Sequence, residues 1–153
     1  MQTASDVIHR LAGKTLATAE SLTAGGIGAA LTAVPGASAV YKGGIISYCN
    51  EVKANLLGVP MEYLDIYGAV SAPVAQAMAE GARKALKADV AISVTGLAGP
   101  GGDEFGHPVG TVFIGFVYEN QAFAREYHFS GDREAVRCRT IEAALNIILE
   151  SLS

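Results

Sequence analysis

A serine and a glycine pair stand directly after the first apolar segment of the chain. The stretch Thr18–Leu31 reads TAESLTAGGIGAAL, in which Ser21 follows the run 15–20, and Gly25 and Gly26 open a helix-like run. At a turn between a strand and a helix, a hydroxyl and free backbone N–H groups can face a ligand, and the hydroxyl becomes a nucleophile when a base takes its proton. The same residue types are typical of a tight turn with a helix cap. Taken alone, these residues leave both interpretations open.

Two further stretches carry groups suited to the same chemistry. Tyr48 provides a phenol at the end of a β-branched segment, Lys53 provides an amine just beyond it, and the glycine-rich stretch TGLAGPGG begins at Thr95. Each of the three stretches lies at the carboxyl end of a predicted strand, and ligands of open α/β sheets bind beyond these ends. The sequence therefore predicts that they meet in one site. Each stretch also has a structural interpretation: a solvated helix lysine, a tyrosine of the sheet, and a glycine-rich turn without a ligand.

Several well-known site motifs are absent at these positions. The run AGGIGAAL has no lysine where a phosphate-binding P-loop needs one, and the first strand–helix turn lacks G-x-G-x-x-G. Ser21 stands in neither G-x-S-x-G nor S-x-x-K. A hydrolase built on Ser21 would therefore need a different base.

The elements that must position these groups alternate between strands and helices. Apolar and β-branched runs predict the first three strands, and a hairpin then follows with a turn at Glu119-Asn120. Ser71 is a suitable N-cap for the fifth helix, and Ser130 or Asp132 for the last. The predicted strands are 15–20, 43–49, 89–95, 110–118 and 121–129, and the predicted helices are 6–12, 25–33, 50–57 with Asn50 as its cap, 60–67, 72–87 and a final one reaching Leu149. This order predicts an α/β fold, a three-layer α/β/α sandwich whose mixed sheet ends in a C-terminal β-hairpin and a final helix.

Length and composition narrow the function classes. The 153 residues, half of them hydrophobic, predict one domain with one core over 1–153. A net charge of −4 argues against nucleic acid as a partner. No apolar run approaches a membrane span and no signal peptide is evident, so we expect no membrane association and a cytoplasmic location. Cys49 and Cys138 form no metal-spaced pair and the histidines are scattered, so we expect neither a metal nor another cofactor.

Six separated blocks resemble one known family. They are AESLTAGG, GGIISYCNEVKANLLGVP, GAVSAPVAQAMAEGAR, SVTGLAGPGG, HPVGTVFIGF and FSGDREAVR, in this order between about Thr15 and Arg139. Together they resemble the CinA C-terminal domain family, which includes nicotinamide mononucleotide deamidases and also occurs fused in competence/damage-inducible proteins. Where the family usually reads A-E-S-C-T-G-G, this chain has Leu22 and Ala24.

The resemblance implies an amidohydrolase that converts nicotinamide mononucleotide to nicotinate mononucleotide and ammonia. Ser21 is then the nucleophile, Lys53 its general base, and Tyr48, expected on the preceding strand, positions Lys53 or passes a proton. A free lysine has a pKa of about 10.4, so useful basicity near neutral pH needs a shift of roughly 3 units, on the order of 4 kcal/mol. Burial under a bound ligand can supply this shift. Backbone N–H groups around Ser21–Thr23 or after Thr95 are the expected oxyanion donors.

The substrate-binding residues follow from the same blocks. The substrate-binding set is Thr23, Gly25, Gly26, Thr95, Gly96, Gly99, Gly101, Gly102, Arg133 and Arg137. Glycines allow close backbone approach to the ribose or phosphate, either in the glycine-rich loop or at the N-terminus of the helix that begins near Gly25. The two arginines are one helical turn apart and could bind the phosphate, or form a solvated face with Glu134.

Other interpretations of function remain at this stage. A non-catalytic nucleotide-binding or regulatory domain could use the same pocket, since fold does not determine activity. An interaction module could work through the small-residue helix 25–33. The alanine-rich helices also lead us to expect a homo-oligomer, most simply a two-fold dimer.

Overall fold

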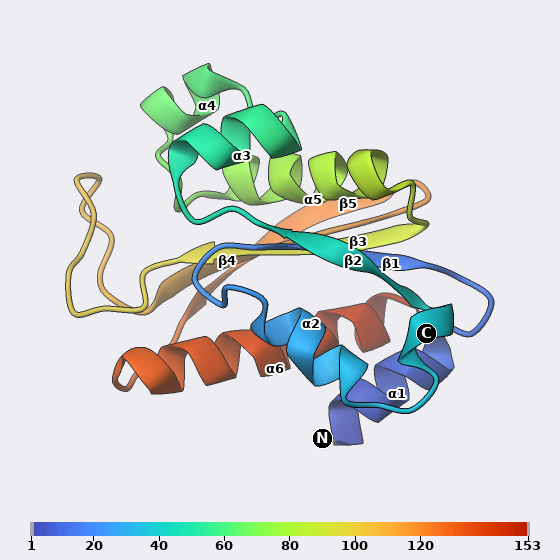
Figure 1. Ribbon diagram of the computed structural model, residues 1–153. Coiled ribbons are helices and arrows are strands. Elements are labelled where there is room, and N and C mark those ends of the chain that lie inside the picture. Colours follow the sequence, from blue (N-terminus) through green and yellow to red (C-terminus); the bar gives the residue numbers. More distant parts are fainter. Residues whose placement is uncertain (1, 153) are drawn as a thin grey trace.

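One mixed five-stranded sheet forms the centre of the protein (Figure 1). The computed structural model describes residues 2–152; Met1 and Ser153, which the predicted domain includes, lie outside the described residues. The strand order is β2-β1-β3-β4-β5. β2, β1 and β3 are parallel to one another, β4 is antiparallel to β3, and β5 is antiparallel to β4. The strands are β1 (Leu16–Glu20), β2 (Tyr41–Ile46), β3 (Val90–Gly96), β4 (Thr111–Tyr118) and β5 (Gln121–His128).

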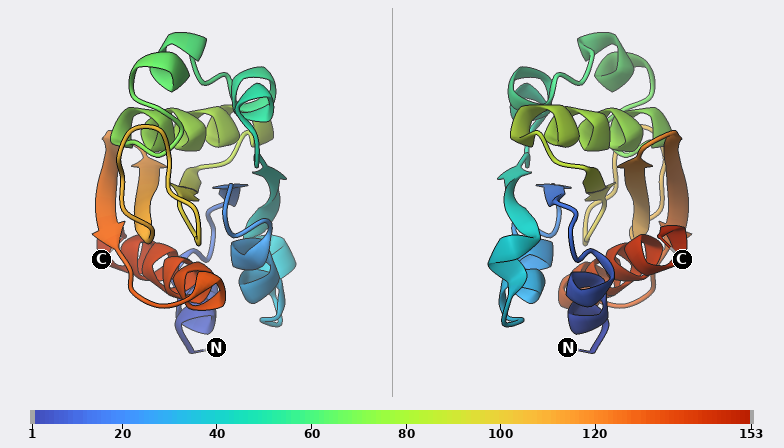
Figure 2. Two further views of the ribbon diagram at one scale, coloured as in Figure 1. Left: turned by 90° about the vertical axis from the view of Figure 1, so that its left-hand side faces the viewer. Right: turned by 90° about the vertical axis from the view of Figure 1, so that its right-hand side faces the viewer.

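Helices cover both faces of this sheet, as the two side views show (Figure 2). One face carries α1 (Gln2–Arg10), α2 (Gly26–Thr32) and α6 (Arg133–Ser151), and the other carries α3 (Asn50–Leu57), α4 (Met61–Ile66) and α5 (Ala72–Leu86). A short 3₁₀ helix spans Ala37–Ala39. The predicted three-layer α/β/α fold is therefore confirmed, including the hairpin and the last helix.

Burial explains why the strands differ in sequence. Every residue of β1 is buried, because this strand lies between two neighbours and beneath helices on both faces. Leu16, Ala17 and Ala19 are apolar, whereas Thr18 and Glu20 are buried polar residues with hydrogen-bond partners. The edge strand β2 instead alternates between half-buried and exposed residues. The two larger apolar clusters lie under α1, α2 and α6 and under α3, α4 and α5, and a third, small one is formed by Val70, Ala75 and Phe113.

The helix caps agree in part with the sequence. Asp132 caps α6, since its carboxylate accepts a hydrogen bond of 2.9 Å from the N–H of Ala135. Ser71 occupies the N-cap position of α5, but its hydroxyl donates to the carbonyl of Gly68 at 2.8 Å. The cap predicted at Asn50 is wrong, because α3 already begins at Asn50 and Cys49 precedes it.

The carboxyl ends of β1, β2 and β3 lie at one edge of the sheet. Because β4 is antiparallel to β3, the glycine-rich segment between them leaves from this edge and returns to it. The turn after β1, the start of α3 and this segment are thus neighbours in space. No helix within residues 2–152 has the length and apolar character needed to cross a bilayer.

Candidate active site

A lysine–serine pair lies at the edge where the three parallel strands end. Ser21 is the first residue after β1, and its N–H donates to the carbonyl of Val94 on β3 at 3.1 Å. Lys53 stands in the first turns of α3, and its Nζ lies 3.1 Å from Ser21 Oγ and donates to the carbonyl of Ser47 at 2.8 Å. Two segments separated by about thirty residues therefore bring an amine against a hydroxyl.

Both members of this pair are removed from bulk water. Lys53 is 1% exposed and Ser21 6%. Burial lowers the pKa of Lys53 from 10.5 to about 8, while the neighbouring Cys49 thiol acts in the opposite direction. Roughly a tenth of the amine is then neutral at pH 7, compared with less than a thousandth for a free lysine. The protein itself thus supplies most of the shift that the sequence led us to expect from a bound ligand.

A cavity of about 610 Å³ opens in front of the pair. Its wall includes Ser21, Lys53, Tyr48, Arg133 and Thr95. Of the glycine-rich loop, Gly96, Gly99 and Gly101 line the cavity, whereas Gly102 does not. The structure therefore brings the three stretches that carry candidate groups into one cavity.

Tyr48 and Arg133 contact each other at the rim of this cavity. Arg133 Nη2 donates to the Tyr48 hydroxyl at 3.0 Å, and Arg133 Nη1 donates to the carbonyl of Gly99 at 2.6 Å. Tyr48 is 61% exposed and lies beyond β2, which ends at Ile46, so its predicted position on the strand is wrong. Arg133 thus links the loop after β3 to the loop after β2 through hydrogen bonds. A guanidinium has five N–H donors, so Arg133 has further donors for a ligand in the cavity.

Three of the predicted binding residues are used by the protein itself. The Thr23 hydroxyl donates to Glu20 at 2.7 Å, and the Thr95 hydroxyl donates to the carbonyl of Ala69 at 2.9 Å. Arg137 does not line the cavity, because its guanidinium donates to the carbonyls of Leu22 and Thr23.

The N-terminus of α2, an expected phosphate position, is occupied by a buried carboxylate. Glu20 accepts hydrogen bonds from the N–H groups of Ile27 at 2.8 Å and Gly28 at 3.1 Å. These are the donors that would otherwise hold an anion at this helix end. Gly25 and Gly26 accordingly lie outside the cavity. Of the two predicted phosphate positions, only the glycine-rich loop faces Ser21.

Some residues of the cavity wall were not identified from the sequence. Asn50 stands at the start of α3, and Asp103, Glu104 and Phe105 come from the glycine-rich loop. The Asp103 carboxylate accepts from the N–H groups of Phe105 and His107 at 3.2 Å and 2.9 Å, which fixes the shape of the loop tip. The sequence does show acidic residues next to the glycines. Whether their side chains reach the cavity depends on how the loop folds, and this could not be read from the sequence.

The departure at position 24 from the family pattern has a conformational consequence. Ala24 adopts φ 48°, a left-handed conformation that costs a residue with a Cβ about 1–2 kcal/mol, and Gly25 follows with φ 97°. We expect Ala24→Gly to raise the free energy of unfolding by about 0.5–1 kcal/mol, because relief of strain exceeds the added entropy of the unfolded chain. Urea denaturation measures this difference.

The matched control for Ala24→Gly is the same replacement in a helix. Ala29 lies within α2 and is exposed, as Ala24 is. Ala29→Gly should lower stability by about 1 kcal/mol, in the opposite direction. A loss of stability in both variants would contradict strain at Ala24.

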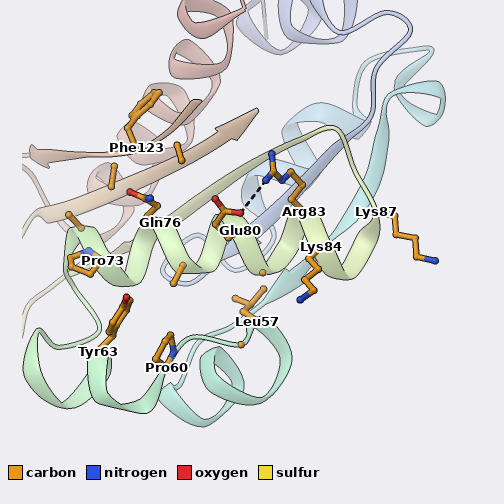
Figure 3. A pocket seen from close by; sticks show the side chains of 16 residues that line it. Leu57, Pro60, Tyr63, Pro73, Gln76, Glu80, Arg83, Lys84, Lys87 and Phe123 are labelled. Carbon is orange, nitrogen blue, oxygen red and sulfur yellow. Dashed lines mark hydrogen bonds and ion pairs between the residues drawn. The ribbon is translucent and has the colours of Figure 1, made fainter. Parts of the chain in front are cut away.

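A second, larger cavity lies away from this pair, along the outer side of α5. It has a volume of about 1310 Å³, and its wall includes Pro73, Gln76 and Lys84 (Figure 3). Glu80 and Arg83 form an ion pair of 3.2 Å there. No serine, threonine, cysteine or histidine lines it, so among the described residues it offers no comparable nucleophile.

Comparisons with known proteins agree with the fold. A sequence model of the CinA C-terminal domain matches residues 1–152. A CinA-like protein of Geobacter sp. (strain M21) is 48% identical over 140 residues, which are 92% of this chain and 34% of that protein. A CinA-like protein of Mycobacterium marinum is 45% identical over 97% of this chain and 35% of its own length. The chain thus spans about a third of the length of these curated relatives.

Solved structures of similar length give the same result. The competence-damaged protein (CinA) superfamily protein of Klebsiella pneumoniae 700603 has a TM-score of 0.96 and 36% identity, covering 99% of this chain and 96% of that one. The corresponding superfamily protein of Escherichia coli has a TM-score of 0.94 and 36% identity, covering 96% and 87%. The chain therefore belongs to the CinA C-terminal domain family.

Proposed function

We propose that this protein is an amidohydrolase that converts nicotinamide mononucleotide to nicotinate mononucleotide and ammonia. The observation that carries the proposal is the buried amine of Lys53, with a pKa of about 8, placed 3.1 Å from the Ser21 hydroxyl in a cavity wall. An amine in this state is a base near neutral pH, and a hydroxyl beside it is a nucleophile.

The proposed reaction proceeds in two stages. Neutral Lys53 takes the Ser21 proton as Oγ bonds to the carboxamide carbon. The lysine then gives this proton to the departing nitrogen, so the C–N bond breaks, ammonia leaves and an ester remains on Ser21. A water molecule next loses a proton to Lys53 and attacks the ester, and the proton returns to Ser21 Oγ as the acid is released. Lys53 thus carries one proton through each stage.

The charges of the cavity wall support a substrate with both a cation and an anion. Asp103 and Glu104 are acidic groups that suit a positively charged pyridinium ring, and Arg133 is a cation with remaining donors for a phosphate. The glycine-rich loop places backbone groups along the same wall. A nucleotide with a cationic base has this combination of charges.

The test is the release of ammonia from nicotinamide mononucleotide by the pure protein. If the site binds the 5′-phosphate, nicotinamide riboside should have a kcat/KM lower by about tenfold or more, because one charge-assisted hydrogen bond contributes about 1.5–3 kcal/mol. Free nicotinamide and glutamine are the controls for a small amide without ribose. Equal kcat/KM values for mononucleotide and riboside would contradict a phosphate subsite.

The second candidate is a non-catalytic nucleotide-binding or regulatory domain. The observation that favours it is Leu22, which stands in the cavity wall where the family usually has cysteine. In that case calorimetry should detect binding of nicotinamide mononucleotide while the protein releases no ammonia. Detection of turnover that depends on Ser21 would exclude this candidate.

A further inference from the structure

We propose that Arg137 is a positioning residue that holds the turn after Ser21 in the shape needed to stabilise the oxyanion. The proposal rests on the proposed function, since it concerns the serine of the same site. Arg137 belongs to the second turn of α6, more than a hundred residues away in sequence from the turn that it contacts. Among the described residues, its guanidinium donates hydrogen bonds to the backbone of that turn.

The contacts of Arg137 fix two successive peptide groups. Arg137 Nε donates to the carbonyl of Leu22 at 2.9 Å, and Nη2 donates to the carbonyl of Thr23 at 3.3 Å. The peptide unit is planar and trans, so a carbonyl and the following N–H point in opposite directions. A guanidinium that holds the Leu22 carbonyl therefore keeps the N–H of Thr23 directed away from α6.

The N–H groups of this turn remain available as donors. Within residues 2–152, the N–H groups of Leu22 and Thr23 donate no hydrogen bond, whereas those of Ser21 and Ala24 both do. Leu22 lines the cavity next to Ser21, whereas Thr23 is buried directly behind it in the same turn and is not part of the cavity wall. Free backbone N–H groups next to a nucleophile are suited to bind the oxygen of a tetrahedral intermediate.

The turn needs support because Ala24, which has a Cβ, is held in a strained conformation, next to a glycine that adopts a similar one freely. Ala24 and Gly25 are both left-handed, with φ 48° and φ 97°. On one side, the buried Glu20 carboxylate accepts from the Thr23 hydroxyl, and on the other side Arg137 holds the carbonyls. Two opposite charges thus clamp the turn, and Arg137 acts on the reaction through the turn rather than by contact with substrate.

This role differs from phosphate binding in its kinetic signature. A phosphate ligand acts on the mononucleotide and not on the riboside, and its loss raises KM. A group that orients oxyanion donors acts equally on both substrates, and its loss lowers kcat. The two roles are therefore separated by the pattern of effects.

The first experiment measures kcat and KM of Arg137→Ala for both substrates. We expect kcat to fall by about 10–100-fold by the same factor for mononucleotide and riboside, with KM within about threefold of the wild type. Arg137→Lys should retain more activity, because an ammonium can still donate to one carbonyl, and added guanidinium should restore part of the activity of Arg137→Ala. Arg139→Ala removes an exposed guanidinium from the same helix and should change none of these values. A loss confined to the mononucleotide would overturn the proposal.

The second experiment does not depend on the identity of the substrate. A fluorophosphonate probe reacts with an activated serine: Ser21 Oγ bonds to phosphorus, fluoride leaves, and Lys53 takes the proton. The labelling rate of Ser21, followed by mass spectrometry, should fall at least tenfold in Arg137→Ala and less in Arg137→Lys. If the wild type is labelled but releases no ammonia, the proposed function fails while this measurement still decides the role of Arg137. Wild-type labelling rates in a folded Arg137→Ala protein would overturn the proposal.

Discussion

Lys53→Arg is expected to lower turnover of nicotinamide mononucleotide by about 10²–10⁴-fold while leaving binding measurable. This range is the usual contribution of a general base. Arginine keeps the positive charge, but its guanidinium does not release a proton in the accessible pH range, so it cannot activate Ser21. Steady-state ammonia release, with calorimetry for binding, measures the two effects separately.

Three further variants test whether Ser21 and Lys53 act together. Ser21→Ala should lose a similar factor, and the double variant should be little worse than either single one, because the two groups act as a unit. Lys84→Arg makes the same replacement at an exposed position of α5 and should change neither turnover nor binding. A folded Lys53→Arg protein with wild-type turnover would refute the serine–lysine mechanism.

Lys53→Met is expected to be inactive and more stable than the wild type at pH 7. The fall of the Lys53 pKa from 10.5 to about 8 corresponds to about 3 kcal/mol of destabilisation in the charged state. Loss of the hydrogen bond to the Ser47 carbonyl offsets about 1 kcal/mol of the gain. Methionine has a similar length without a charge, so a net gain of about 2 kcal/mol is expected.

The pH dependence of this gain identifies its cause. Between pH 8 and about 10.5 the unfolded wild type binds more protons at this lysine than the folded one, so wild-type stability relative to Lys53→Met rises across this window. The gain is therefore largest below pH 8 and shrinks toward pH 10.5. Urea denaturation of both proteins at pH 7 and pH 10 measures it, with Lys84→Met as the exposed control. A difference that is independent of pH would exclude desolvation of Lys53 as the cause.

Much of the candidate site follows from rules that relate local sequence to topology. The turn at Ser21, the segment from Tyr48 to Lys53 and the loop after Thr95 each follow a parallel strand, and parallel strands end at one edge. Their convergence could therefore be predicted before any contact was known. The pattern of apolar runs likewise identified every strand, with ends that differ by at most three residues.

The errors arose where tertiary partners decide the outcome. β2 ends at Ile46 because its pairing partner β1 ends at Glu20, so Tyr48 has no neighbouring strand. The direction of each guanidinium on α6 depends on which backbone carbonyls face that helix. The spacing of Arg133 and Arg137 in the sequence therefore does not show that Arg133 lies at the cavity and Arg137 behind the turn. Glu20 gave no sign that it would occupy the end of α2, because its partners lie on the next element.

The glycine-rich loop after β3 has a closed neck, and this has a consequence for how the family can diversify. The N–H of Leu97 donates to the carbonyl of Thr111 at 2.9 Å, and the N–H of Gly110 donates to the carbonyl of Leu97 at 2.8 Å, so the segment between them leaves and returns at one point. Doubling the length of such a segment costs only about 0.6 kcal/mol of closure entropy. The length and sequence of this segment can therefore vary at low cost in stability. Such variation would change the shape of one wall of the cavity without moving Ser21 and Lys53, which lie on other elements.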